Sequence, residues 1–270
     1  MPYPALRLSP ITSTVGPLAA LAPQTVRSNK RPGEKRMSIL ASKEAVLAAE
    51  NVSKQVSSPE GGLTILSEVS FSISGGESVA IVGASGAGKS TLLALLAGLD
   101  LPSTGSVWLD GHNLTELDED GRAEVRAASV GFVFQSFHLV PSLNALENVM
   151  LPLELSGVRD ARAKASDILK QVGLDERWSH YPAQLSGGEK QRVAIARAFA
   201  TEPAVLFADE PTGNLDSRTG DHIMDLMFDL NRDSSTTLIL VTHDKALAGR
   251  CEREIGLDAG RLISDSKAAG

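Results

Sequence analysis

Cysteine, long apolar runs and positive charge are all scarce in this 270-residue chain. Its single cysteine, Cys251, excludes an internal disulfide and is typical of proteins from a reducing compartment. The longest strongly apolar stretch, residues 92–99, is much shorter than the roughly 20 residues of a membrane-spanning helix. We therefore expect a globular chain that does not itself cross a membrane, and its 42% hydrophobic residues are enough to form a core.

Positive charge is concentrated at the start of the chain. Residues 1–36 hold six Lys or Arg and one acidic residue, Glu34, whereas the remainder holds 20 basic and 32 acidic side chains. A body with a net charge of −12 lacks the basic face that nucleic-acid binding requires. We therefore expect no nucleic acid among the partners.

Residues 1–44 are rich in Pro, Ser, Ala and Arg and have no sustained apolar period. Such a composition predicts disorder. An over-extended gene start, with Met37 as the true first residue, explains it equally well. A faint signal-peptide pattern at residues 15–22 is interrupted by Pro17. We expect the folded domain to occupy residues 45–265.

From residue 45 onward the pattern is that of an α/β fold. β-Branched runs at residues 69–73 and 78–82 flank the Gly75-Gly76 turn and predict two strands. Residues 143–184 show helical spacing without a convincing strand, which predicts a helical subdomain at about residues 136–184. Further strands are expected at residues 105–109, 130–135, 204–208 and 236–241, helices at 189–200 and 220–230, and a late hairpin around 258–261. This order predicts a mostly parallel sheet with flanking helices, antiparallel N-terminal strands and an inserted helical subdomain.

A glycine-rich run lies between the strand at residues 78–82 and a helix that extends to residue 97. It fits the pattern G-x-x-x-x-G-K-[ST], and its position after a strand and before a helix identifies a P-loop and a P-loop NTPase core. Backbone N–H groups of such a loop bind phosphates, Lys89 reaches the β and γ oxygens, and Ser90 binds Mg²⁺. The predicted nucleotide-binding residues are Gly83, Ala84, Ser85, Gly86, Ala87, Gly88, Lys89, Ser90 and Thr91.

Two adjacent carboxylates follow the apolar strand at residues 204–208. Asp209 stands at its carboxyl end, where it can hold Mg²⁺ through water, and Glu210 stands where a base for the attacking water is needed. Adjacent acids at a strand end are often only a solvated edge. A P-loop in the same chain favours the catalytic interpretation.

A second glycine-rich run, residues 185–191, leads straight into the helical pattern of residues 189–200. Ser186, Gly187 and Gly188 place backbone N–H groups at a helix start, where the helix dipole attracts negative charge. The chain therefore holds two phosphate cradles that are far apart in sequence. The P-loop already accounts for nucleotide binding, so the second phosphate cradle requires a separate explanation.

Together these runs resemble the motifs of ABC ATPases, in that family's order and across residues 45–265. In the family, the Ser-Gly-Gly run binds the γ-phosphate of ATP held by the opposite subunit, which implies a homodimer with two composite sites. The resemblance also implies that His243 contacts the γ-phosphate and that Gln135 senses Mg²⁺ and the attacking water. Asp216, which also suits a helix N-cap, would lie in a loop that crosses the dimer interface. The implied catalytic groups are Glu210, His243, Gln135 and Lys89, and the implied magnesium ligands are Ser90, Gln135 and Asp209.

The stretches at residues 131–149 and 208–216 resemble the lipoprotein-release and macrolide-export group of these ATPases. That resemblance implies the energy-coupling subunit of a membrane export or extraction complex, on the cytoplasmic face of the inner membrane. It would contact the membrane only through an integral-membrane permease, whose coupling helices dock in the groove beside Gln135. A soluble non-transport ABC ATPase and a regulatory, membrane-associated one remain alternatives.

One element departs from the family pattern. Many ABC domains stack an aromatic residue on adenine just after the first strand, and Val56 stands at the matching position here. Losing such stacking costs roughly 1–3 kcal/mol by analogy with other aromatic–base contacts. We therefore expect weak discrimination between ATP and GTP.

Overall fold

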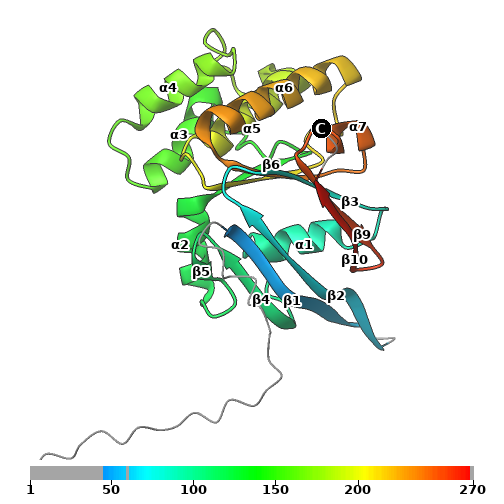
Figure 1. Cartoon of the computed structure of the whole chain (residues 1–270). Coiled ribbons are helices and arrows are strands. Elements are labelled where there is room, and N and C mark those ends of the chain that lie inside the picture. Colours follow the sequence, from blue (N-terminus) through cyan, green and yellow to red (C-terminus); the bar gives the residue numbers. More distant parts are fainter. Residues whose placement is uncertain (1–44, 59–60, 268–270) are drawn as a thin grey trace, which may run out of the picture. The chain divides into compact units, whose positions relative to one another are not determined.

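The computed structural model describes residues 45–58 and 61–267, and the expectations for residues 1–44 lie outside this part of the chain. Two sheets form the framework (Figure 1). The four-stranded antiparallel sheet has the order β2 (Gly61–Ser74), β1 (Ala45–Ser58), β4 (Thr104–Leu109) and β5 (His112–Asn113). The six-stranded sheet has the order β10 (Arg261–Lys267), β9 (Arg253–Asp258), β3 (Ser78–Val82), β8 (Thr237–Val241), β7 (Val205–Asp209) and β6 (Val130–Phe134).

In the larger sheet every neighbouring pair is parallel except β9 and β10, which form the expected late hairpin. The helices are α1 (Lys89–Leu96), α2 (Glu119–Ser129), α3 (Ala145–Leu155), α4 (Ala161–Gln171), the 3-10 turn η2 (Pro182–Gln184), α5 (Gly187–Phe199), α6 (Ser217–Ser234) and α7 (Lys245–Ala248). The predicted mixture of parallel core, antiparallel N-terminal strands and helical insert is confirmed. Helix α6 is longer than the sequence pattern indicated.

Both faces of the parallel sheet are buried, which explains why its strands are apolar without interruption. Successive residues of one strand supply different cores: Ile81 packs toward α1 and the antiparallel sheet, whereas Ala80 packs toward α5 and α6. Phe207 and Leu206 divide in the same way on β7. The sheet is thus sandwiched between the antiparallel sheet with α1 on one side and two long helices on the other.

The helical region α3–α4 packs on α5 through a third apolar cluster, which includes Val149, Leu153 and Leu169. Helix α3 starts with a reciprocal capping box, in which Asn144 and Glu147 bind each other's backbone N–H. Asn148, fully buried, donates to the carbonyls of Val140, Leu143 and Asn144 and accepts from the Val140 N–H. This amide therefore fastens the loop that follows β6 to the first turn of α3.

The parallel register brings the carboxyl ends of four strands to one edge. Val241 of β8 pairs with Ile81 of β3 on one side and with Asp209 of β7 on the other. Asp209 pairs in turn with Phe134 of β6. The segments that follow β3, β6, β7 and β8 therefore leave the sheet side by side. Such an edge is where open α/β sheets bind their ligands.

Candidate functional site

The P-loop follows β3, and its lysine is hydrogen-bonded to carbonyl groups of the same loop. Gly88 has a left-handed φ of 100°, and a Cβ there would lie 3.1 Å from the Ile65 carbonyl oxygen. Lys89 Nζ donates to the carbonyl oxygens of Gly83 and Ala84 at 2.8 and 3.1 Å. The ammonium group thus already stands over the loop on which phosphates would lie.

A cavity of about 360 Å³ joins the P-loop to the ends of β7 and β8. Nine of its lining residues were predicted from the sequence: Ser85, Gly86, Gly88, Lys89, Ser90, Thr91, Asp209, Glu210 and His243. Two lining residues, Ile65 and Val241, were missed because they carry no polar group. Of the predicted P-loop residues, Gly83, Ala84 and Ala87 are absent from the lining. Buried Ala87 instead accepts a hydrogen bond from the Gly260 N–H.

Asp209 ends β7 half-buried beside Ser90 and Lys89. Burial and the neighbouring Glu210 charge raise the pKa of Asp209, while a hydrogen bond with Ser90 and the Lys89 charge oppose that shift. A carboxylate and a hydroxyl are oxygen donors of the kind that Mg²⁺ prefers. Among the described residues no group of three or more His, Cys, Asp or Glu could hold a metal.

Glu210 and His243, 33 residues apart, are in direct contact. His243 Nδ1 lies 2.7 Å from Glu210 Oε1, and the His243 backbone N–H donates to the same oxygen at 3.1 Å. Glu210 has a left-handed φ of 45°, and its backbone N–H donates to the Val241 carbonyl at 2.9 Å. A strained backbone at a fixed carboxylate is a feature of functional sites. The pair can orient a water molecule and accept its proton.

Gln135 comes directly after β6 and is not among the residues that line the P-loop cavity. Its Nε2 donates to Asn214 Oδ1 at 3.4 Å, and Asn214 Nδ2 returns a bond to the Gln135 carbonyl at 2.9 Å. A Cβ at Gly213 would lie 2.6 Å from Gln135 Nε2, so glycine permits this approach. The structure thus places Gln135 against the loop before α6, and its role as a magnesium ligand stays a prediction.

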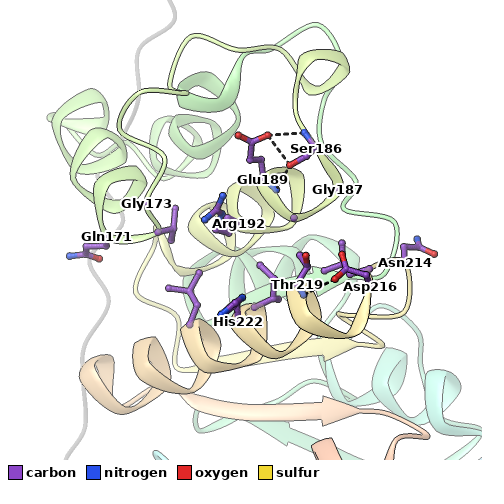
Figure 2. Close-up of a pocket in the computed structure, with 15 residues that line it drawn as sticks. Gln171, Gly173, Ser186, Gly187, Glu189, Arg192, Asn214, Asp216, Thr219 and His222 are labelled. Carbon is purple, nitrogen blue, oxygen red and sulfur yellow. Dashed lines mark hydrogen bonds between the residues drawn. The ribbon is translucent and has the colours of Figure 1, made fainter.

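The Ser-Gly-Gly cradle (Ser186, Gly187 and Gly188) opens α5 and lines a different cavity, of about 700 Å³, between α5 and α6 (Figure 2). The two cavities share no lining residue. Asp216 also lines the second cavity and caps α6, accepting from the Thr219 N–H at 3.0 Å. Hydrogen bonds from Thr219 lower the pKa of Asp216. The cap predicted at Asp216 is confirmed, and one chain does not bring its two phosphate cradles together.

Val56 lies across the β1–β2 pair from Leu63, so their side chains share a face, and Ile65 follows on that face. Ile65 reaches the P-loop cavity. Val56, Leu63 and Ile65 are aliphatic, so none of the three can read the hydrogen-bonding edge of a base.

We expect GTP to compete with ATP, because aliphatic contacts are the same for both bases. The GTP concentration that halves ATP turnover should lie within about tenfold of the ATP concentration that gives half-maximal rate. A competition assay measures this ratio. Val56→Tyr is the matched variant, and it is expected to bind ATP about fivefold more tightly through stacking. A strong preference for ATP in the unmodified protein would contradict the expectation.

A separate apolar groove of about 310 Å³ lies between the helical region and the sheet. It is lined by Ala127, Val130, Gly131, Phe132, Pro152, Leu155, Ser156, Arg197, Ala198 and Thr201. Leu155 is 81% exposed at its rim. Arg197 donates to the carbonyls of Phe137 and His138, both of which have positive φ, and so holds the loop after Gln135 in a strained form. Burial lowers the pKa of Arg197.

Comparison with known proteins agrees with this geometry. A family model described as "ABC transporter" matches residues 66–213. The ABC transporter ATP-binding protein YbbA of Escherichia coli K12, itself described as uncharacterized, is 56% identical over 225 residues, which cover 83% of this chain and 99% of the relative. The lipoprotein-releasing system ATP-binding protein LolD of Coxiella burnetii is 47% identical over 82% of this chain and 97% of the relative.

Solved structures show the same likeness. The ATP-binding cassette MJ0796, in a dimeric post-hydrolysis state bound to ADP and Pi, superimposes with a TM-score of 0.76 at 42% identity. The match covers 83% of this chain and 99% of the other. No helix among the described residues has both the length and the apolar character to cross a membrane.

Proposed function

This chain belongs to the ABC transporter family and is an ATP-binding cassette that hydrolyses ATP, and from that premise we propose that it is the energy-coupling subunit of a membrane export or extraction complex. Two chains would act as a homodimer on the cytoplasmic face of the inner membrane, docked on an integral-membrane permease. The relatives named for lipoprotein release support this assignment.

The separation of the two phosphate cradles is the observation that carries the proposal. The P-loop, Glu210 and His243 share one cavity, whereas Ser186 lines another. A head-to-tail dimer brings each P-loop opposite the Ser-Gly-Gly cradle of its partner, which gives both cradles the same nucleotide to bind. The solved relatives are dimeric, which supports a dimer of this chain.

Hydrolysis in such a site relies on fixed groups of this chain. Lys89 and the P-loop N–H groups bind the phosphates, and Ser90 and Asp209 are the residues that would hold Mg²⁺. When bound, Mg²⁺ neutralises phosphate charge. Glu210 would orient the attacking water and accept its proton, while His243, which is hydrogen-bonded to Glu210, would contact the γ-phosphate.

The apolar groove is the surface proposed for permease docking. Phe132, Leu155 and Arg197 line it, and Arg197 also ties the loop after Gln135 to α5. Rings of Phe132, Phe134 and His138 stack in succession, with centroids 5.3 and 4.7 Å apart. Movement of a docked helix would therefore reach Gln135 through a short, packed segment. An exposed apolar side chain beside an apolar groove is a common feature of protein interfaces.

The proposal is tested by capturing partners from detergent-solubilised membranes of the native host with tagged Glu210→Gln protein and ATP. We expect one multi-spanning membrane protein in stoichiometric amount. We expect Leu155→Glu to remove it, because a charge would enter the apolar groove, while ATP-dependent dimerisation continues. Ile263→Glu, at a 67% exposed position on β10, is the matched control and should keep the partner. Recovery of soluble partners alone would favour a non-transport ATPase.

A further inference from the structure

The hydroxyl of Ser186 is already engaged within its own chain. Ser186 caps α5, and its Oγ donates to Glu189 Oε2 at 2.8 Å, while the Ser186 backbone N–H donates to the same oxygen at 2.8 Å. Figure 2 shows both bonds above the start of the helix. A hydroxyl has one proton to donate. While Glu189 accepts that proton, Ser186 cannot donate it to a phosphate.

Glu189 also opposes a phosphate by its charge. Its hydrogen bonds with Ser186, and secondarily Arg177, lower the pKa of Glu189 to about 2, so the carboxylate is ionised at neutral pH. It stands in the first turn of α5, where the positive end of the helix dipole attracts anions. An incoming γ-phosphate and the Glu189 carboxylate therefore compete for the same hydroxyl, N–H groups and dipole.

Arg177 is the cation that faces this carboxylate. Its Nε lies 3.0 Å from Glu189 Oε1, the oxygen that Ser186 does not use. The loop that carries Arg177 is anchored to the start of α3, because the carbonyls of Trp178 and His180 accept from the N–H groups of Leu146 and Ala145, each at 2.9 Å. Arg177 is thus held in place by a segment outside α5.

We propose that Arg177 is a positioning residue that makes the Ser-Gly-Gly cradle receptive to the partner's nucleotide by drawing Glu189 charge away from Ser186. The inference rests on the proposed function, since it concerns the composite site. With Arg177 present, the guanidinium neutralises part of the negative charge of Glu189. A phosphate can then displace the carboxylate from the Ser186 hydroxyl. Without it, the full charge of Glu189 stays on that hydroxyl and repels ATP. Charge-assisted hydrogen bonds are about twice as strong as neutral ones, so this competition is a strong one.

The test is a sedimentation-velocity titration of dimer formation against ATP, in Glu210→Gln protein so that ATP is not consumed. Arg177→Met keeps an unbranched, flexible side chain of about the length of the arginine's aliphatic stem and removes the guanidinium charge. We expect it to raise the ATP concentration for half-dimerisation about tenfold, equivalent to one lost charge-assisted hydrogen bond. Arg177→Lys should restore most of the loss. In hydrolysing protein, Arg177→Met should raise KM by the same factor and change kcat less than about twofold.

The decisive comparison uses Glu189→Gln, which removes the competing charge. In that background Arg177→Met should have no effect on the ATP midpoint. Arg232→Ala, which breaks an exposed ion pair with Asp229 on α6, is the control and should not shift it. An unshifted midpoint in Arg177→Met, or a shift that persists with Glu189→Gln, would overturn the inference and leave the composite dimer standing. Failure of the parent Glu210→Gln protein to dimerise at any ATP concentration would instead refute the composite site, and this inference with it.

Discussion

Glu210→Gln is expected to lower ATP turnover by at least about 100-fold, the usual contribution of a general base, while ATP still binds. The amide keeps the size of the side chain and can still accept from His243, but it cannot take a proton from water. The nucleotide then remains intact between the two chains, and the protein accumulates as an ATP-bound dimer. Steady-state phosphate release and sedimentation velocity with ATP measure the two effects.

Asp225→Asn is the matched control, since Asp225 is an acid on α6 that pairs with Arg250. It also exchanges a carboxylate for an amide, and it should leave turnover within about twofold because such exposed pairs contribute little. Near-normal turnover in Glu210→Gln would mean that another group activates the water. Lost turnover without ATP-dependent dimers would mean that the variant fails before chemistry.

The parts of this site that the sequence predicts are those whose chemistry is local. The P-loop, Asp209 with Glu210 and the Ser-Gly-Gly cradle are each contiguous runs at an end of a strand or helix. The spacing of the residues within each run is enough to predict which backbone groups that run presents to a ligand. Asp216 is a similar case, because a cap depends on the next three residues only.

Contacts between segments depend on strand register, and no local pattern encodes it. His243 meets Glu210 because β7 and β8 are parallel neighbours in register. Gln135 turns toward Asn214 because a glycine at position 213 leaves room for it. Arg177 reaches Glu189 across a loop and the 3-10 turn η2, and only the fold shows that the pair is formed. Ile65 lies on β2, but the sequence predicted a strand there only at residues 69–73, so its place in the cavity lining was not expected.

The second prediction with a large effect tests whether each ATP site is formed by two chains. Lys89→Ala removes the P-loop ammonium, and Ser186→Asp places a carboxylate in the phosphate cradle while keeping a residue that caps helices well. Each variant alone is expected to lose at least about 99% of ATP turnover, since both of its sites are damaged. Ser186→Thr keeps the hydroxyl and should stay within about threefold of the unmodified protein.

Mixing the two inactive variants should restore activity if the sites are composite. In a mixed dimer, the intact P-loop of the Ser186→Asp chain faces the intact cradle of the Lys89→Ala chain, so one site is whole and the other carries both defects. Random pairing forms such dimers as about half of the total, and we expect phosphate release at least about tenfold above either variant alone. Turnover that stays at the level of the separate variants would imply either that each chain uses its own cradle or that two intact sites must act together. A dimer with both substitutions in one chain and none in its partner separates these cases, because composite pairing leaves it no intact site while within-chain pairing leaves it one.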